Sequence, residues 1–184
     1  MEPITYHLVA LLPIKAHSAR ITGKNFKPFV GKPLFFWILS TLLSIKEIEL
    51  IVINTDARVL LHKYGIPDST RVIIRDRKPE IRGDFVSMNL VLADDVMAIS
   101  SQNYLMTHAT NPLLSASTIR MALDKYYEGL DSGKSDSLFS VNRYQTRFYR
   151  QNGSPINHDP MNLIRTQDLE PWFEENSNLY LFSK

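Results

Sequence analysis

The 184-residue sequence contains no cysteine. This excludes a disulfide framework and every site that needs a thiolate, whether as a nucleophile or as a metal ligand. It also fits a cytoplasmic protein, which is the location we expect. The N-terminus lacks a basic segment followed by an apolar stretch, so we expect no signal peptide. No apolar run approaches the ~20 residues that span a bilayer, and we expect no membrane partner.

An excess of charge of one sign is also missing. The chain has 21 Lys and Arg against 19 Asp and Glu, a net charge of +2. Such a small excess does not by itself indicate nucleic acid or a membrane surface as a partner. The hydrophobic fraction of 44% is typical of a globular protein, and the length suits one domain. We therefore expect a single domain over residues 1–184.

Short apolar runs alternate with longer amphipathic stretches along most of the chain. This pattern predicts repeated β-α units, and so an α/β fold with an open, mainly parallel sheet. Asp56 and Asp84 are placed to cap the second and third helices, and the pair Asp94-Asp95 is expected on an exposed helix face. Strands are expected at residues 7–13, 50–54, 71–74, 104–107, 138–141 and 179–182, and helices at residues 33–44, 56–64, 86–99 and 115–127, the last ended by Gly129.

Residues 142–178 break this pattern. They are rich in Arg, Tyr, Asn, Pro and Trp and have no clean period. A stretch of this length without regular elements is usually functional, so we interpret it as an arm, with a short hairpin around Asn152-Gly153. Aromatic residues interleaved with arginines can stack on single-stranded nucleic acid, but they also mark protein interfaces. We favour an interface. The chain stops directly after its last predicted strand, so we expect it to lack a C-terminal segment of the complete fold.

The loop after the first strand is the first candidate for a ligand site, because ligands of open α/β sheets bind beyond the carboxyl ends of the strands. Small and hydroxyl residues separate its four cations, Lys15, Arg20, Lys24 and Lys27. Such a loop could wrap a polyphosphate, or it could be a solvated surface loop. It matches neither the P-loop nor the dinucleotide-binding fingerprint.

The order of residues along the chain resembles that of the acylneuraminate cytidylyltransferase family, which includes the CMP-sialic acid synthetases. The resemblance covers essentially the whole chain. It is carried by Leu11-Leu12-Pro13, Ser18 and Arg20, Gly23-Lys24-Asn25, Lys27-Pro28, Gly31-Lys32-Pro33-Leu34, Asn54-Thr55-Asp56, Arg77 with Pro79-Glu80, Gly83-Asp84 with Ser87, Thr110-Asn111-Pro112-Leu113, Arg165-Thr166-Gln167-Asp168-Leu169, and Glu175-Asn176 before the last strand.

The resemblance implies a three-layer, Rossmann-like nucleotidyltransferase fold with a protruding dimerisation arm at residues 142–178. It implies transfer of CMP from CTP to an acidic, nonulosonic-type sugar, with release of pyrophosphate and with Mg²⁺, in a homodimer. Members of this family suggest a role for each matching position. Catalysis falls to Lys24, Arg20 and Lys15, nucleotide binding to Pro13, Ser18, Lys24, Asn25, Ser87 and His108, and sugar binding to Thr110, Asn111, Arg165 and Gln167.

This sequence departs from the family pattern in several places. Lys15-Ala16-His17 replaces an Arg-Gly-Gly, so the charge is kept but the bidentate geometry of arginine is lost. His108 replaces a glutamine, and both ligand contact and a structural hydrogen bond remain open for it. The family's Asp-x-Asp magnesium motif would follow the point where this chain stops, so we expect no metal ligands within the chain and poor catalysis by it. Two alternatives stay open: a non-catalytic nucleotide-binding or dimerisation module, and a nucleotide-sugar glycosyltransferase-like domain.

Overall fold

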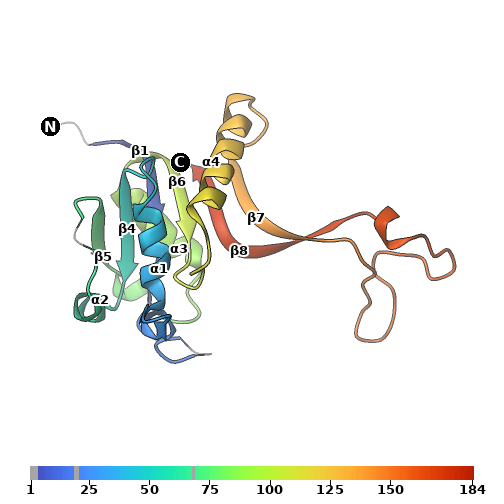
Figure 1. The fold of residues 1–184 in the computed structure, drawn as a ribbon, viewed down its shortest axis with the longest axis horizontal. Coiled ribbons are helices and arrows are strands. Elements are labelled where there is room, and N and C mark those ends of the chain that lie inside the picture. The colour runs from blue at the N-terminus through green and yellow to red at the C-terminus, as the bar shows by residue number, and fades with distance from the viewer. Residues whose placement is uncertain (1–3, 19–20, 68) are drawn as a thin grey trace. The chain divides into compact units, whose positions relative to one another are not determined.

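The computed structural model describes residues 4–18, 21–67 and 69–184. The chain divides into two compact units (Figure 1). The first comprises residues 1–139 and 178–184, and the second comprises Ser140–Ser177. Two strands, β7 and β8, run from one unit into the other. The first unit carries the α/β architecture that the sequence predicts.

A six-stranded sheet organises the fold, with the strand order β5-β4-β1-β6-β8-β7. Strands β5, β4, β1 and β6 are parallel, and β8 pairs with β6 in the antiparallel sense. The chain runs from β1 outward through β4 to β5 and then crosses to β6 on the other side of β1. The bounds are β1 Tyr6–Leu11, β4 Leu50–Thr55, β5 Val72–Asp76, β6 Ser101–Thr107, β7 Ser137–Tyr144 and β8 Trp172–Ser183.

Helices cover both faces of this sheet and give three layers. The side chains of β1 alternate between the faces, because successive residues of a strand point to opposite sides. Leu8 and Ala10 join a core with α1 and α4, whereas Val9 and Leu11 join a second core with α3. Figure 1 shows α1 and α4 on the viewer's side of the sheet and α3 behind it. The helices are α1 Leu34–Leu43, α2 Arg58–Tyr64, α3 Met88–Ala98 and α4 Ala116–Asp131.

The expected strands and helices of the first unit are present, with shifted ends. Two predicted caps are wrong. The cap position of α2 is Ala57, and the Asp56 carboxylate instead accepts a hydrogen bond from the backbone of Ala16. α3 begins after Ser87, whose hydroxyl accepts from the backbone of Asn89, so Asp84 is not its cap. α4 continues past Gly129 to Asp131.

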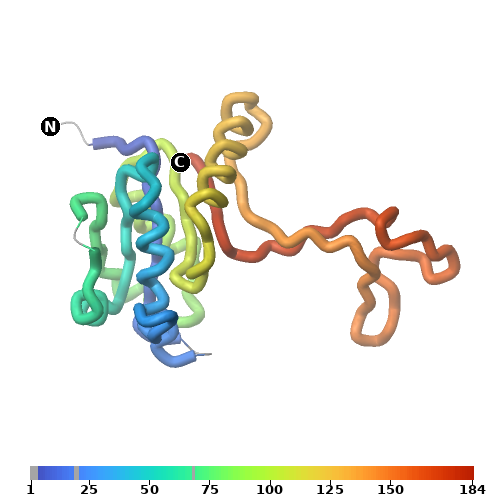
Figure 2. The backbone as a smooth tube through the Cα atoms, in the orientation of Figure 1, coloured from blue at the N-terminus to red at the C-terminus, as the bar shows by residue number. Residues whose placement is uncertain are grey.

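The second unit contains more regular structure than its sequence suggested. β7 reaches Tyr144 and β8 begins at Trp172, so both strands extend into the stretch for which no strand was expected. A turn lies at Asn152-Gly153, where the N–H of Arg150 donates to the carbonyl of Ser154 over 2.8 Å. The rest is loop, apart from a short 3₁₀ turn at Thr166–Asp168, and Figure 2 traces its course.

Among the described helices, none combines the length with the apolar character needed to cross a bilayer.

Candidate active site

A pocket of about 110 Å³ lies at the carboxyl end of the parallel strands. Its lining comes from the loop after β1, from the 3₁₀ turn η1 (Lys24–Phe26), from the segment after β5, from the start of α3 and from the loop after β6. The order of strands reverses between β1 and β6, which is where open α/β sheets bind ligands. The lining residues are Pro13, Lys15, Ser18, Lys24, Asn25, Arg77, Met88, His108, Ala109 and Thr110.

The loop after β1 is fixed to the neighbouring strand beyond the end of β1. The N–H of Leu12 donates to the carbonyl of Val52 over 2.9 Å, and the N–H of Ile14 donates to that of Asn54 over 3.0 Å. One residue past Lys15, the N–H of Ala16 donates to Oδ1 of Asp56 over 2.7 Å. Lys15 is thus held between two anchored residues and points its charge toward the pocket from a defined position.

The turn η1 places two more predicted residues in the pocket wall. Nδ2 of Asn25 donates to the carbonyl of Lys15 over 3.0 Å and so joins the two parts of the loop. Asn25 is only 7% exposed although it lines the pocket. Below it, the buried ring of Phe26 packs edge-on against Phe35, with ring centroids 5.5 Å apart. The apolar anchor at Phe26 therefore fixes the backbone that presents Lys24 and Asn25.

Lys15 also forms an ion pair with Asp84, the residue that the sequence had assigned to a helix cap. Asp84 lies in the loop before α3 and is about half exposed, so water screens this pair. Ser87, expected to contact the nucleotide, caps α3 and is not part of the pocket lining, although the adjacent Met88 is. A ligand role for Ser87 stays a prediction.

Arg77 is a pocket residue that our sequence reasoning did not assign to the site. It is 4% exposed and is held by Asn54, whose side-chain and backbone oxygens accept from Nε and Nη2 over 2.9 and 3.0 Å. Burial lowers the pKa of Arg77, while the charges of Asp56 and Asp95 act in the opposite direction. The available signal was position: Arg77 lies three residues past the end of the predicted strand 71–74, at the edge of the sheet where ligands bind.

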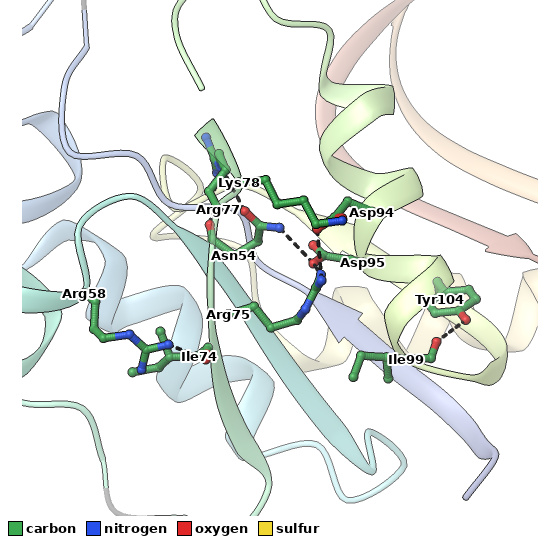
Figure 3. A network of polar contacts seen from close by, with 10 residues as sticks. All are labelled: Asn54, Arg58, Ile74, Arg75, Arg77, Lys78, Asp94, Asp95, Ile99 and Tyr104. Carbon is green, nitrogen blue, oxygen red and sulfur yellow. Dashed lines mark hydrogen bonds and ion pairs between the residues drawn. The ribbon is translucent and has the colours of Figure 1, made fainter. Parts of the chain in front are cut away.

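Behind Arg77, Asn54 belongs to a network of polar side chains (Figure 3). Its Nδ2 donates to Oδ1 of Asp95 over 2.8 Å, and Arg75 from β5 pairs with both Asp94 and Asp95. The expectation of an exposed Asp94-Asp95 face is therefore wrong. Asp95 is fully buried, and only 9% of the Asp94 side chain is exposed.

The pKa values of these two carboxyl groups shift in opposite directions. Burial raises the pKa of Asp95, and the hydrogen bond from Asn54 and the contacts with Arg75 only partly oppose it. Burial acts in the same direction on Asp94, but the Lys78 ammonium and Arg75 outweigh it and leave the pKa of Asp94 lowered. Asp95 is thus the more desolvated charge, and it depends on its partners.

The loop after β6 contributes His108, Ala109 and Thr110 to the pocket. Burial, and secondarily the charge of Lys24, lower the pKa of His108. The imidazole is therefore biased toward its neutral form. Asn111 is not in the lining. Its Nδ2 donates to the carbonyl of Asn178 over 3.0 Å and thereby ties this loop to β8.

The remaining predicted site residues are Arg20, Arg165 and Gln167. Arg20 is outside the described residues. Arg165 and Gln167 belong to the second unit, where Arg165 pairs with Asp168 and the carbonyl of Gln167 accepts from Gln145. Their roles toward a sugar stay predictions.

Among the described residues, no group of three or more His, Asp or Glu side chains could hold a metal by itself. The carboxylates on the loops around the pocket have partners within the chain, since Asp56 accepts from the backbone of Ala16 and Asp84 pairs with Lys15. Mg²⁺ is usually held by one or two carboxylates together with substrate phosphates and waters. The absence of a magnesium ligand from this chain stays a prediction, and no step is assigned to a resident metal.

Comparison with known proteins places this chain in a family. A model of the cytidylyltransferases, described as "Cytidylyltransferase", matches residues 9–184. Pseudaminic acid cytidylyltransferase of Campylobacter jejuni is 25% identical over 186 residues, covering 94% of this chain and 76% of that protein. N-acylneuraminate cytidylyltransferase of Oncorhynchus mykiss is 26% identical over 187 residues, covering 97% of this chain but only 41% of that protein.

Solved structures agree on the fold. A CMP:2-keto-3-deoxy-manno-octonic acid synthetase complexed with CTP has a TM-score of 0.68 at 16% identity, over 96% of this chain and 74% of that one. A 4-diphosphocytidyl-2C-methyl-D-erythritol synthase from Anaerococcus prevotii has a TM-score of 0.59 at 14% identity, over 97% of this chain and 70% of that one. The family match favours the predicted activity over the glycosyltransferase alternative. This chain belongs to the cytidylyltransferase family and is a nucleotidyltransferase with an α/β fold.

Proposed function

We propose that this chain transfers CMP from CTP to the hydroxyl of an acidic sugar of the nonulosonic type and releases pyrophosphate. The observation that carries the proposal is the pocket of the cytidylyltransferase fold, where Lys15, Lys24 and Arg77 converge with Asn25 and His108. The relatives named above act on pseudaminic and N-acylneuraminic acids, which supports this class of sugar.

The reaction is an in-line displacement at the α-phosphorus of CTP. The sugar hydroxyl oxygen forms the new bond to phosphorus and gives up its proton, while the bond to the oxygen that bridges to the β-phosphate breaks. Negative charge then builds on the departing pyrophosphate. Lys15 and Lys24 neutralise that charge, and the anchored loop holds the phosphates in line. We propose that Mg²⁺ enters as the counter-ion of CTP.

Nucleotide binding is tested by thermal unfolding with CTP, ATP, GTP or UTP, each with Mg²⁺. At a concentration a hundred times its Kd, CTP should stabilise the fold by about 2.7 kcal/mol. For a chain of this size, that is a rise in Tm of roughly 5–10 °C. The rise should be specific to CTP and lost in Lys24→Ala. The matched control is Lys27→Ala, since Lys27 is an exposed lysine of the same loop that does not line the pocket.

Catalysis is tested by release of pyrophosphate from CTP in the presence of pseudaminic or N-acylneuraminic acid. CTP-specific stabilisation without pyrophosphate release from any acidic sugar would favour the alternative of a nucleotide-binding module. No stabilisation by any nucleotide would contradict the proposal itself.

We further propose a homodimer formed through residues 142–178. The second unit exposes many large apolar side chains, as interfaces do. They are Tyr144, Tyr149, Ile156, Met161, Leu163, Ile164, Trp172 and Phe173. Light scattering should give twice the chain mass, and Met161→Glu combined with Leu163→Glu should halve it. A monomer without these changes would refute the dimer. We propose the cytoplasm, where CTP is available, as the location.

A further inference from the structure

Buried hydrogen bonds hold the guanidinium of the pocket residue Arg77 in place. Its backbone N–H donates to the carbonyl of Thr55 over 2.8 Å, and its own carbonyl accepts from Nε of Arg82 over 2.8 Å. Both contacts of its guanidinium go to Asn54, through Nε and Nη2. These two bonds do not use Nη1. Because one side of the planar guanidinium is bonded to Asn54, its remaining N–H donors point in one direction.

The hydrogen bond from Nε of Arg77 depends on which way the side-chain amide of Asn54 points. An arginine is a donor only, so Arg77 needs the oxygen of that amide, and the amide nitrogen then faces the other way. There it meets Oδ1 of Asp95 at 2.8 Å, an acceptor. With the amide reversed, its nitrogen would face the arginine and its oxygen would face the carboxylate, and both contacts would be repulsive. Asp95 therefore selects the orientation of Asn54 that holds Arg77.

Both intermediary residues are buried, so water cannot take over their contacts. Asn54 and Asp95 are each 0% exposed. Arg75, the register partner of Asn54 on β5, keeps Asp95 paired through its guanidinium (Figure 3). Because Asn54 is neutral, it orients Arg77 without placing a carboxylate against it. The positive charge of Arg77 thus stays available to an anionic ligand.

We propose that Asp95 and Asn54 are positioning residues for the nucleotide pocket: Asp95, acting through Asn54, fixes the guanidinium of Arg77 in the pocket wall. This rests on the proposed function only in that CTP is the ligand that reports the effect. Neither residue touches the ligand itself. Asp95 sits on α3, behind β4, and Arg77 lies in the loop after β5.

The first test compares Asp95→Leu with Asp94→Leu by calorimetric titration with CTP. Asp95→Leu removes the acceptor that selects the Asn54 orientation, and CTP binding should weaken about tenfold, as expected for coupled polar neighbours. Asp94→Leu is the matched control, because Asp94 is on the same helix and pairs with Arg75 and Lys78 but not with Asn54. Its effect should stay within about twofold.

A double-mutant cycle separates positioning from a structural role. In the Arg77→Ala background, Asp95→Leu should change CTP affinity by no more than about twofold, because the residue through which it acts is gone. A merely structural role of Asp95 would weaken CTP binding equally in both backgrounds. That result would overturn the proposal. Asn54→Ala, which leaves the pair between Asp95 and Arg75 in place, gives the same cycle should Asp95→Leu not fold.

A second readout needs no nucleotide. The Nε–H of Arg77, assigned by its loss in Arg77→Ala, should give a slowly exchanging NMR signal in the unmodified protein and in Asp94→Leu. In Asp95→Leu and in Asn54→Ala this proton should exchange rapidly. An unchanged signal in both variants would overturn the proposal. If the unmodified protein does not bind CTP, the proposed function fails, and the NMR measurement still decides the positioning role.

Discussion

Asn25 offers a way to separate the stability of the nucleotide loop from its affinity for a triphosphate. Its Nδ2 donates to the carbonyl of Lys15 over 3.0 Å, and the side chain lines the pocket. Asn25→Ala removes this bond, which should cost about 1 kcal/mol of stability. For a chain of this size, that lowers Tm by about 2–4 °C.

Asn25→Asp removes the same donor but adds a negative charge to the pocket. The stability loss should be at least as large, because a carboxylate oxygen then faces the carbonyl of Lys15, which is also an acceptor. Binding should respond very differently. A carboxylate ~5 Å from a phosphate charge opposes it by about 3 kcal/mol at an effective dielectric constant of ~20. That energy corresponds to a loss of affinity of roughly a hundredfold.

The assay measures Tm and the Kd for CTP for both variants. Gln102→Glu is the control for net charge, because Gln102 is exposed at the amino end of β6, whereas the pocket lies beyond its carboxyl end. The chain takes six residue steps from Gln102 to the pocket residue His108, a distance of ~20 Å in an extended strand. This is well beyond the screening length of ~8 Å at physiological salt. If Asn25→Asp binds CTP as tightly as Asn25→Ala, the pocket does not hold the phosphates and the reasoning is refuted.

Three further perturbations have defined signs. Burial and the charge of Lys24 lower the pKa of His108 below its usual 6.5, so the folded chain binds fewer protons there than the unfolded chain. The contribution of neutral His108 to the free energy of unfolding is complete above pH 6.5 and falls as the pH drops through the lowered pKa. When the free energy of unfolding is measured in urea across pH 7.5–5.5, His108→Gln should therefore give a flatter pH profile. Val30 has φ 48°, a left-handed backbone conformation that strains a valine, and it is 76% exposed. Val30→Asn should therefore stabilise the fold by about 1 kcal/mol in thermal unfolding, and a loss of stability would contradict this reasoning. Ser115 caps α4 by accepting from the N–H of Thr118 over 3.1 Å, and Ser115→Ala should cost about 1 kcal/mol in thermal unfolding.

The alternation of apolar runs was sufficient to predict the layered sheet, because burial on both faces leaves a local signature in each strand. β1 reads as a continuous apolar run and is central, as expected. The loop after it was identified as a ligand site by its place in the fold, and Pro13, Lys15, Ser18, Lys24 and Asn25 do meet in one pocket. Whether they bind nucleotide stays a prediction.

The buried polar network was not predicted, because it joins residues that are far apart in the sequence. Asp94-Asp95 was interpreted as a solvated charge run. A local signal was available, however, since Asp95 lies in the apolar stripe of α3 with Val91, Leu92 and Val96, at helical spacing. Arg75 gave a matching signal, as a charged residue that directly follows the apolar run Val72-Ile73-Ile74 of β5. A buried acid and a buried base in neighbouring elements are expected to pair.

The extent of β7 and β8 was missed for a different reason. Both strands are largely exposed along the second unit, so the apolar alternation that marks a half-buried strand is absent from their sequences. Their pairing rests on contacts such as that between Ser140 and Asn176, 36 residues apart. A sequence window shorter than that separation does not contain both residues, so it does not reveal that the two strands pair.

The cations of the pocket differ in how they are held, and this difference bears on catalysis. Arg77 is fixed by a neutral, buried amide, so its orientation exists before a ligand arrives and its charge is not neutralised by that contact. Lys15 instead pairs with the half-exposed carboxylate of Asp84, a contact that solvent already weakens. A triphosphate would have to displace Asp84 from Lys15, but it would meet Arg77 already in place. Preorganised charge acts in full on a ligand, because no reorganisation opposes it. The buried network behind Arg77 therefore contributes a pre-oriented cation to the pocket, which the solvent-weakened pair of Lys15 and Asp84 does not.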